Sequence, residues 1–90
     1  MKNIEKFQAP IMNQIQIEYN KLDHYEFMDF LRENLGRPFT NNADWGGAYV
    51  WPLGGSNYVG EFLYYGDNEL LILKREIVDE SYIDTVLVEF

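Results

Sequence analysis

The chain has 90 residues, of which 47% are hydrophobic, 17% aromatic and 24% charged, a composition typical of one small folded domain and not of a disordered chain. It contains no cysteine, which excludes disulfide bonds and thiolate metal sites. The formal charge is −8, and residues 46–90 hold eight acidic but only two basic residues. Such a surface repels phosphate groups, so it disfavours binding to nucleic acid or anionic lipid and favours a basic protein surface as partner.

The chain shows no segment that would direct it into or across a membrane. Its N-terminal residues MKNIEKFQAPIMNQ mix charged, polar and apolar side chains, and no apolar run is long enough to span a bilayer. We therefore expect a cytoplasmic protein that does not bind membranes.

The segment at residues 9–21 carries two conflicting patterns. Its apolar residues recur every three or four positions, which is the helical period. However, QIQIEY alternates strictly and is rich in Ile, which favours a strand. Pro10 suits the first turn of a helix that begins near Ala9. The longer pattern predicts a helix here, with a strand as the alternative.

A second helix is predicted over residues 23–35. Asp23 is a favourable N-cap, and Glu26 three residues later completes a capping box. Gly36 and Pro38 supply the helix exit and prevent its continuation. Apolar residues fall on one face of this helix at helical spacing: Phe27, Met28, Leu31 and Leu35.

Four strand-like runs follow the loop after Pro38. They are AYVWPL (48–53), NYVGEFLYY (57–65), ELLILKREIV (69–78) and SYIDTVLVEF (81–90). The turns between them are short, which forces neighbouring strands to run antiparallel. The simplest topology is therefore a meander.

These elements predict a single α+β domain over residues 1–90. One or two N-terminal helices, within residues 1–37, are expected to pack in two layers on a C-terminal antiparallel sheet of about four strands, within residues 46–90. In the run 57–65 neither alternating face is uniformly polar. We therefore expect the helices to bury one face of the sheet and leave the other face exposed, aromatic and acidic.

The first candidate surface is aromatic. Residues 44–69 hold two Trp and four Tyr, the residue types enriched in binding hot spots. The two Trp flank a glycine pair and precede Pro52, where full burial is difficult. The alternative is that these rings form the core of the sheet. The predicted partner-binding rings are Trp45, Tyr49, Trp51 and Tyr58.

The second candidate surface is acidic. Alternate residues of a strand lie about 7 Å apart, a spacing similar to that of successive phosphates, so a row of carboxylates can imitate a nucleic-acid backbone. The alternative is a solvated surface that keeps a small protein soluble. The acidic residues predicted to bind a partner are Glu61, Asp67, Glu69, Asp79 and Glu80.

Catalytic and cofactor motifs are missing from the sequence. The only histidine, His24, lies at the start of the second helix, and capping explains its acidic neighbours. The sequence GDNE at 66–69 lacks the ligand spacing of a calcium loop, and no basic residue adjoins the glycine pairs to hold an anion. We therefore predict a protein that is not an enzyme and has no catalytic residues, cofactor or metal.

In composition alone, the chain resembles inhibitors encoded by mobile elements, which act against host defence, and immunity proteins that neutralise toxins. We hypothesise a binding protein that occludes the basic surface of a partner protein. It would be either an inhibitor of a nucleic-acid-handling enzyme or, as the alternative, an immunity protein that neutralises a toxin. A different hypothesis is an assembly subunit that forms a homodimer through the aromatic sheet face. A third is a small-molecule or glycan binder that uses stacked rings.

Overall fold

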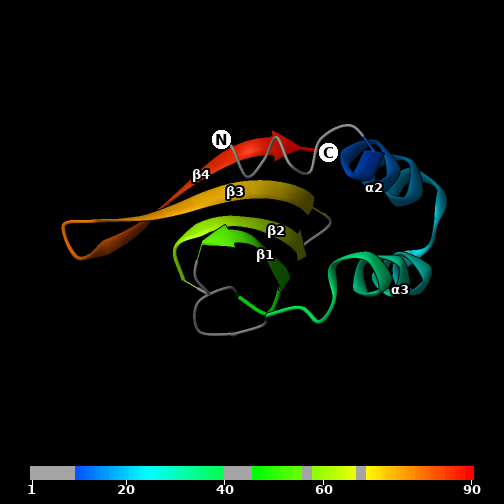
Figure 1. Cartoon of the computed structure of the whole chain (residues 1–90), viewed down its shortest axis with the longest axis horizontal. Helices are drawn as coiled ribbons and strands as arrows, with labels where there is room; N and C mark the ends of the chain where they lie inside the picture. The colour runs from blue at the N-terminus through cyan, green and yellow to red at the C-terminus, as the bar shows by residue number, and fades with distance from the viewer. Residues whose placement is uncertain (1–9, 40–45, 56–57, 67–68) are drawn as a thin grey trace. The chain divides into compact units, whose positions relative to one another are not determined.

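A computed structural model of the chain describes residues 10–39, 46–55, 58–66 and 69–90. The chain divides into two compact units, Met1–Arg37 and Pro38–Phe90. The first unit contains helices α2 (Pro10–Lys21) and α3 (His24–Leu35). The second unit contains four strands (Figure 1): β1 (Tyr49–Gly55), β2 (Gly60–Gly66), β3 (Glu69–Val78) and β4 (Ser81–Glu89). The α+β class is confirmed, with two helices preceding a four-stranded antiparallel meander.

Helix α2 resolves the conflict at residues 9–21 in favour of the helix. It begins at Pro10, as expected from the fixed φ of proline in a first turn. Ile15 is buried whereas Ile17 is exposed, because side chains two positions apart on a helix point to nearly opposite sides. The Ile alternation that favoured a strand therefore does not define one buried face.

Helix α3 begins and ends as the sequence predicts. The Asp23 carboxylate accepts a hydrogen bond of 2.8 Å from the Glu26 N–H, and the Glu26 carboxylate accepts one of 3.2 Å from the Asp23 N–H. This capping box satisfies two N–H groups at the helix start. At the other end Gly36 has φ 87°, a conformation that glycine adopts without a side-chain clash. Phe27 is buried and contacts Tyr19 of α2, with ring centroids 5.4 Å apart.

The four strands pair in the order β1-β2-β3-β4. Strand β2 begins at Gly60, three residues later than the start of the predicted run, and close approach of two backbones explains this glycine. A Cβ at residue 60 would lie 2.1 Å from the carbonyl oxygen of Gly54 on β1. The register shifts between Pro52 and Gly54, and again between Ile72 and Leu73 where β3 pairs with β4. Both shifts are bulges that bend the strands.

Both faces of the sheet bury side chains, so the prediction of one exposed aromatic and acidic face is wrong. On one face Val50 and Phe62 belong to a buried cluster. On the other face Trp51 and Leu63 lie opposite each other and are fully buried. Consecutive strand residues point to opposite faces, so their joint burial means that both faces are covered there. Exposure in this sheet depends on position along the strands instead of on the face.

The distal half of the β3–β4 hairpin is the exposed part of the sheet. Strand β2 begins opposite Arg75, so β3 beyond Arg75 pairs with β4 alone among the described residues. Residues 76–83, called the arm below, form a two-stranded ribbon that runs past the ends of β1 and β2 (Figure 1). The arm is therefore a feature that the strand count alone does not indicate.

Candidate interaction surface

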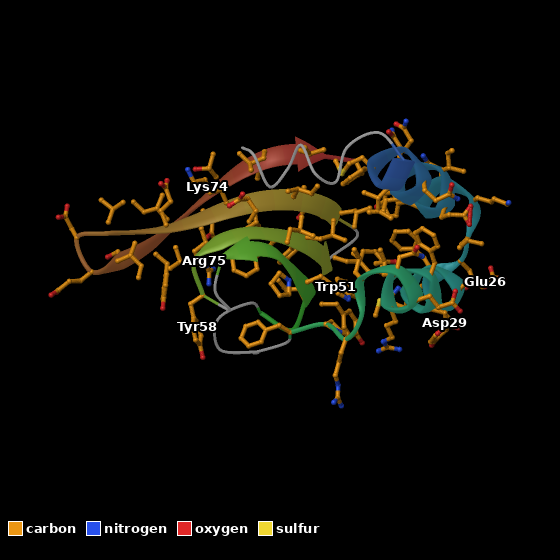
Figure 2. All side chains as sticks on the ribbon, viewed as in Figure 1. Glu26, Asp29, Trp51, Tyr58, Lys74 and Arg75 are labelled. Atoms are coloured by element: carbon orange, nitrogen blue, oxygen red, sulfur yellow. The ribbon has the colours of Figure 1, made fainter. Side chains whose placement is uncertain are left out.

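The arm and the adjoining part of β4 hold most of the strongly exposed large hydrophobic side chains of the described residues. Four of these eight side chains lie in the arm and a fifth, Val86, lies in β4 opposite Leu73, with exposures between 45% and 57%. A two-stranded ribbon has no second layer on either face, so its apolar side chains remain in water unless another molecule covers them. Figure 2 shows side chains standing out from both sides of this ribbon. The five residues are Ile77, Val78, Tyr82, Ile83 and Val86.

The tip of the arm is a two-residue turn with two carboxylates. Val78 pairs with Ser81, which leaves Asp79 and Glu80 as the central residues, with φ values of 50° and 65°. Positive φ at both positions defines a type I′ turn, whose twist matches that of the flanking strands. The turn predicted from VDES is thus confirmed, and it presents two exposed acidic side chains at the end of the ribbon.

The base of the arm is held by an ion pair that the sequence analysis did not identify. The guanidinium of Arg75 donates hydrogen bonds of 2.7 and 2.9 Å to the two carboxylate oxygens of Asp84. Its Cζ also lies 5.0 Å from the ring centroid of Tyr82, which is within the range of a cation–π contact. A planar guanidinium that binds a carboxylate through two donors fixes orientation as well as charge. The pair therefore joins β3 to β4 where the arm leaves the sheet.

The two basic residues of the second unit are both engaged in ion pairs. Arg75 pairs with Asp84, and the neighbouring Lys74 lies 3.4 Å from Glu76; both basic residues are labelled in Figure 2. Residues 38–90 contain nine acidic and two basic residues, for a formal charge of −7, whereas residues 1–37 contain six and five, for a charge of −1. The acidic excess of the protein therefore belongs to the sheet unit.

The residues predicted to bind a partner do not form one surface. Trp45 and Asp67 lie outside the described residues. Tyr49 is half-buried at the start of β1, and Tyr58 is exposed in edge-to-face contact with Phe39, with ring centroids 5.9 Å apart. The structure brings together only Asp79 and Glu80. Glu69 lies at the opposite end of β3, which at about 3.3 Å per residue is roughly 30 Å away.

Two predicted residues are inaccessible, which corrects the expectation that they face a partner. Trp51 is 0% exposed and lies opposite Leu63 within β1, which is an edge strand of the sheet and not a loop (Figure 2). Glu61 is 8% exposed and lies in β2 opposite Lys74. A side chain sealed within the folded chain cannot contact another molecule without rearrangement, so neither residue supports a binding surface.

One signal in the sequence could have located Arg75 and Asp84. In a hairpin with a two-residue turn, residues at equal distances from the turn lie opposite each other. With Asp79 and Glu80 at the centre, Arg75 and Asp84 are such a pair. Opposite charges at directly paired positions stabilise a sheet, so the turn prediction already implied this contact.

The described residues contain no group of three or more His, Asp or Glu side chains that could hold a metal ion. Within the same part of the chain, no helix has the length and apolar character needed to cross a membrane. No family model, no curated protein and no solved structure matches this chain. Its function is therefore argued from the chemistry of its own surface.

Proposed function

We propose that this protein is a small acidic binding protein that occludes a basic surface of a partner protein, with the arm as the inserted element. The observation that carries this proposal is the coincidence of exposed apolar side chains and an acidic tip on one ribbon. Apolar residues supply affinity when a partner removes them from water. Acidic residues select a basic partner and accelerate its encounter.

The dimensions of the arm suit insertion into a cleft. Three residue pairs, from Glu76 and Ile83 to Val78 and Ser81, extend beyond the end of β2, which corresponds to about 10 Å of ribbon. Ile77 and Tyr82 point to one face of the ribbon while Val78 and Ile83 point to the other, because side chains alternate along each strand. A cleft that encloses the ribbon would therefore meet apolar side chains on both of its walls.

The partner class follows from charge. Proteins that bind nucleic acid carry clefts lined with Lys and Arg, because these residues neutralise phosphates. A ribbon with Asp79 and Glu80 at its tip, on a unit of charge −7, is complementary to such a cleft. An inhibitor of a nucleic-acid-handling enzyme, as encoded by mobile elements, is the form of this function that we favour. A toxin with a basic active-site cleft would be occluded by the same contacts, with this protein then acting as its immunity protein.

The test uses the purified full chain as immobilised bait in an extract of its native cell. Two carboxylates are removed from the tip in the variant Asp79→Asn/Glu80→Gln. A matched control removes two exposed carboxylates from α3, Asp29→Asn/Glu33→Gln. We expect the wild type and the control to retain the same basic protein and the tip variant to retain several-fold less of it. Added nucleic acid or a rise in salt from about 0.05 to 0.5 M should release it.

Equal retention by the tip variant and the control would contradict the proposal, as would a retained protein that lacks a basic surface. The variant Ile77→Thr/Ile83→Thr tests the apolar contribution separately, since Thr preserves the strand preference while removing apolar area. It should also retain less of the captured protein, while circular dichroism shows that it is folded.

A homodimer is the second candidate, favoured by the exposure of five large apolar side chains in one hairpin. Two copies joined through the arm would bring together two sheet units that each carry a charge of −7, which opposes association. Sedimentation at micromolar concentration distinguishes the two candidates. A monomer is expected for the binding protein, and a concentration-dependent dimer would favour the assembly subunit.

A further inference from the structure

The two edges of the sheet differ in their protection. At the β1 edge, Pro52 lacks an N–H, a bulge follows it, and the N–H of Phe39 already bonds to the carbonyl of Val50. Proline, bulges and covering segments are the usual means of blocking a sheet edge. Strand β4, with the sequence SYIDTVLVE, contains no proline, glycine or lysine, and no strand among the described residues pairs with its outer side. In the described part of the chain, the β4 edge is thus unpaired where the β1 edge is blocked.

The turn determines which backbone groups face this open edge. In a two-residue hairpin the residues that flank the loop form a hydrogen-bonded pair, and hydrogen-bonded and non-hydrogen-bonded pairs then alternate. Ser81 and Ile83 therefore direct their backbone groups toward β3, whereas Tyr82, Asp84 and Val86 direct theirs to the outer edge. These three residues supply the donors and acceptors for one more strand.

The side chains of β4 are sorted by face. Asp84 and Glu89 are opposite Arg75 and Leu71, so both carboxylates lie on one face of the sheet. The other face carries β-branched residues: Ile83, Thr85 and Val88. Tyr82 and Val86 share the face of the two carboxylates. An incoming strand would therefore place alternate side chains on the face that holds both carboxylates of β4, and the ones between on the face of Ile83, Thr85 and Val88. Asp84 accepts two hydrogen bonds from Arg75 and retains further acceptor positions on the same oxygens.

We propose that the outer edge of β4 accepts an extended cationic segment of the partner as a fifth strand, one in which Lys or Arg alternates with β-branched residues. This inference rests on the proposed function and identifies the partner's contacting element. Charge complementarity selects this occupant over a second copy, because the sheet unit carries −7 and the strand itself has two acidic residues and no basic residue. Main-chain hydrogen bonds supply affinity in such strand addition, and the alternating side chains supply specificity.

The experiment uses three synthetic peptides as probes, each nine residues long to match β4. The first alternates lysine and valine. The second has the same composition and charge but arranges the residues in pairs, two lysines then two valines, so that they cannot separate onto two faces. The third has the alternating sequence with N-methyl groups on four successive central nitrogens, which blocks backbone pairing on both of its edges. Binding to the full chain is measured by fluorescence anisotropy at low salt.

We expect the alternating peptide to bind at least about ten-fold more tightly than either control. A second readout is amide hydrogen exchange, for which the chain contains its own control. The outward N–H groups of Tyr82, Asp84 and Val86 should exchange several-fold more slowly when the alternating peptide is bound. The N–H of Ile83, which already faces β3, should change little.

The outcomes separate this inference from the proposed function. Equal affinity of the three peptides, or no binding by any of them, overturns strand addition, and so does unchanged exchange at the three outward amides. The proposed function is contradicted by a different result, namely that the tip variant and the α3 control retain the same amount of captured protein. Slow exchange at these amides without peptide, together with a dimer in sedimentation, would assign the edge to a second copy and overturn the inference.

Discussion

Arg75 and Asp84 face each other directly across β3 and β4, and their side chains form two parallel hydrogen bonds of 2.7 and 2.9 Å. Gly60, the first residue of β2, is opposite Arg75 on its other side. Gly60 in turn pairs with Gly55 of β1, so the pair lies in the last row that all four strands share, and beyond it only the arm continues. The Arg75 side chain is 8% exposed, so the arm begins at a guanidinium that is almost removed from water.

Removing the charge of Asp84 should destabilise the protein. In Asp84→Asn the buried guanidinium of Arg75 loses a charged, two-point acceptor, and we expect the free energy of unfolding to fall by about 1–2 kcal/mol. The value is at the lower end for ion pairs because Asp84 itself is partly exposed. Urea denaturation measures it. Glu76→Gln, which breaks the exposed Lys74–Glu76 pair, is the control and should cost less than about 0.5 kcal/mol. Equal effects of the two variants would show that burial of Arg75 does not matter.

The turn at the tip should be improved by residues that prefer positive φ. Asp79 and Glu80 both adopt φ values that Asn and Gly tolerate better. The variant Asp79→Asn/Glu80→Gly should therefore raise the free energy of unfolding by about 0.5–1 kcal/mol. Asp79→Asn/Glu80→Gln removes the same two charges and also supplies Asn, but it lacks the glycine. A gain of the same size in this control would show that glycine at position 80 does not stabilise the turn.

Burial of Trp51 can be measured by fluorescence. The variant Trp45→Phe leaves Trp51 as the only tryptophan. Because its side chain is 0% exposed, its emission should be blue-shifted and iodide should quench it several-fold less in the native protein than in urea. Efficient quenching in the native state would show that Trp51 is accessible and would restore it as a candidate contact residue.

Local signals predicted the elements of this chain well. The capping box of Asp23 and Glu26, the exit at Gly36 and the turn at Asp79 and Glu80 each depend on residues close in sequence, and the structure contains all of them. The helix at residues 10–21 was harder to predict, because the alternating sequence QIQIEY is also compatible with a strand. Only the burial of Ile15 together with the exposure of Ile17 resolves it.

The candidate site was predicted less well, because accessibility is a long-range property. The side chains of Trp51 and Ile83 are both large and apolar and both lie in strands, yet one is sealed and the other exposed. The difference arises from the strands beside them, since β1 pairs with β2 in the covered part of the sheet whereas the arm extends past the end of β2.

The order of helices and strands, the antiparallel connections and the acidic excess could be predicted from the amino-acid sequence, because capping, periodicity, turn chemistry and charge are local or additive. Which rings are buried and how far the arm extends past β2 became evident only in the folded structure. These depend on strand lengths and pairing between distant residues, and a shift of one residue in that pairing would exchange the two faces of a strand.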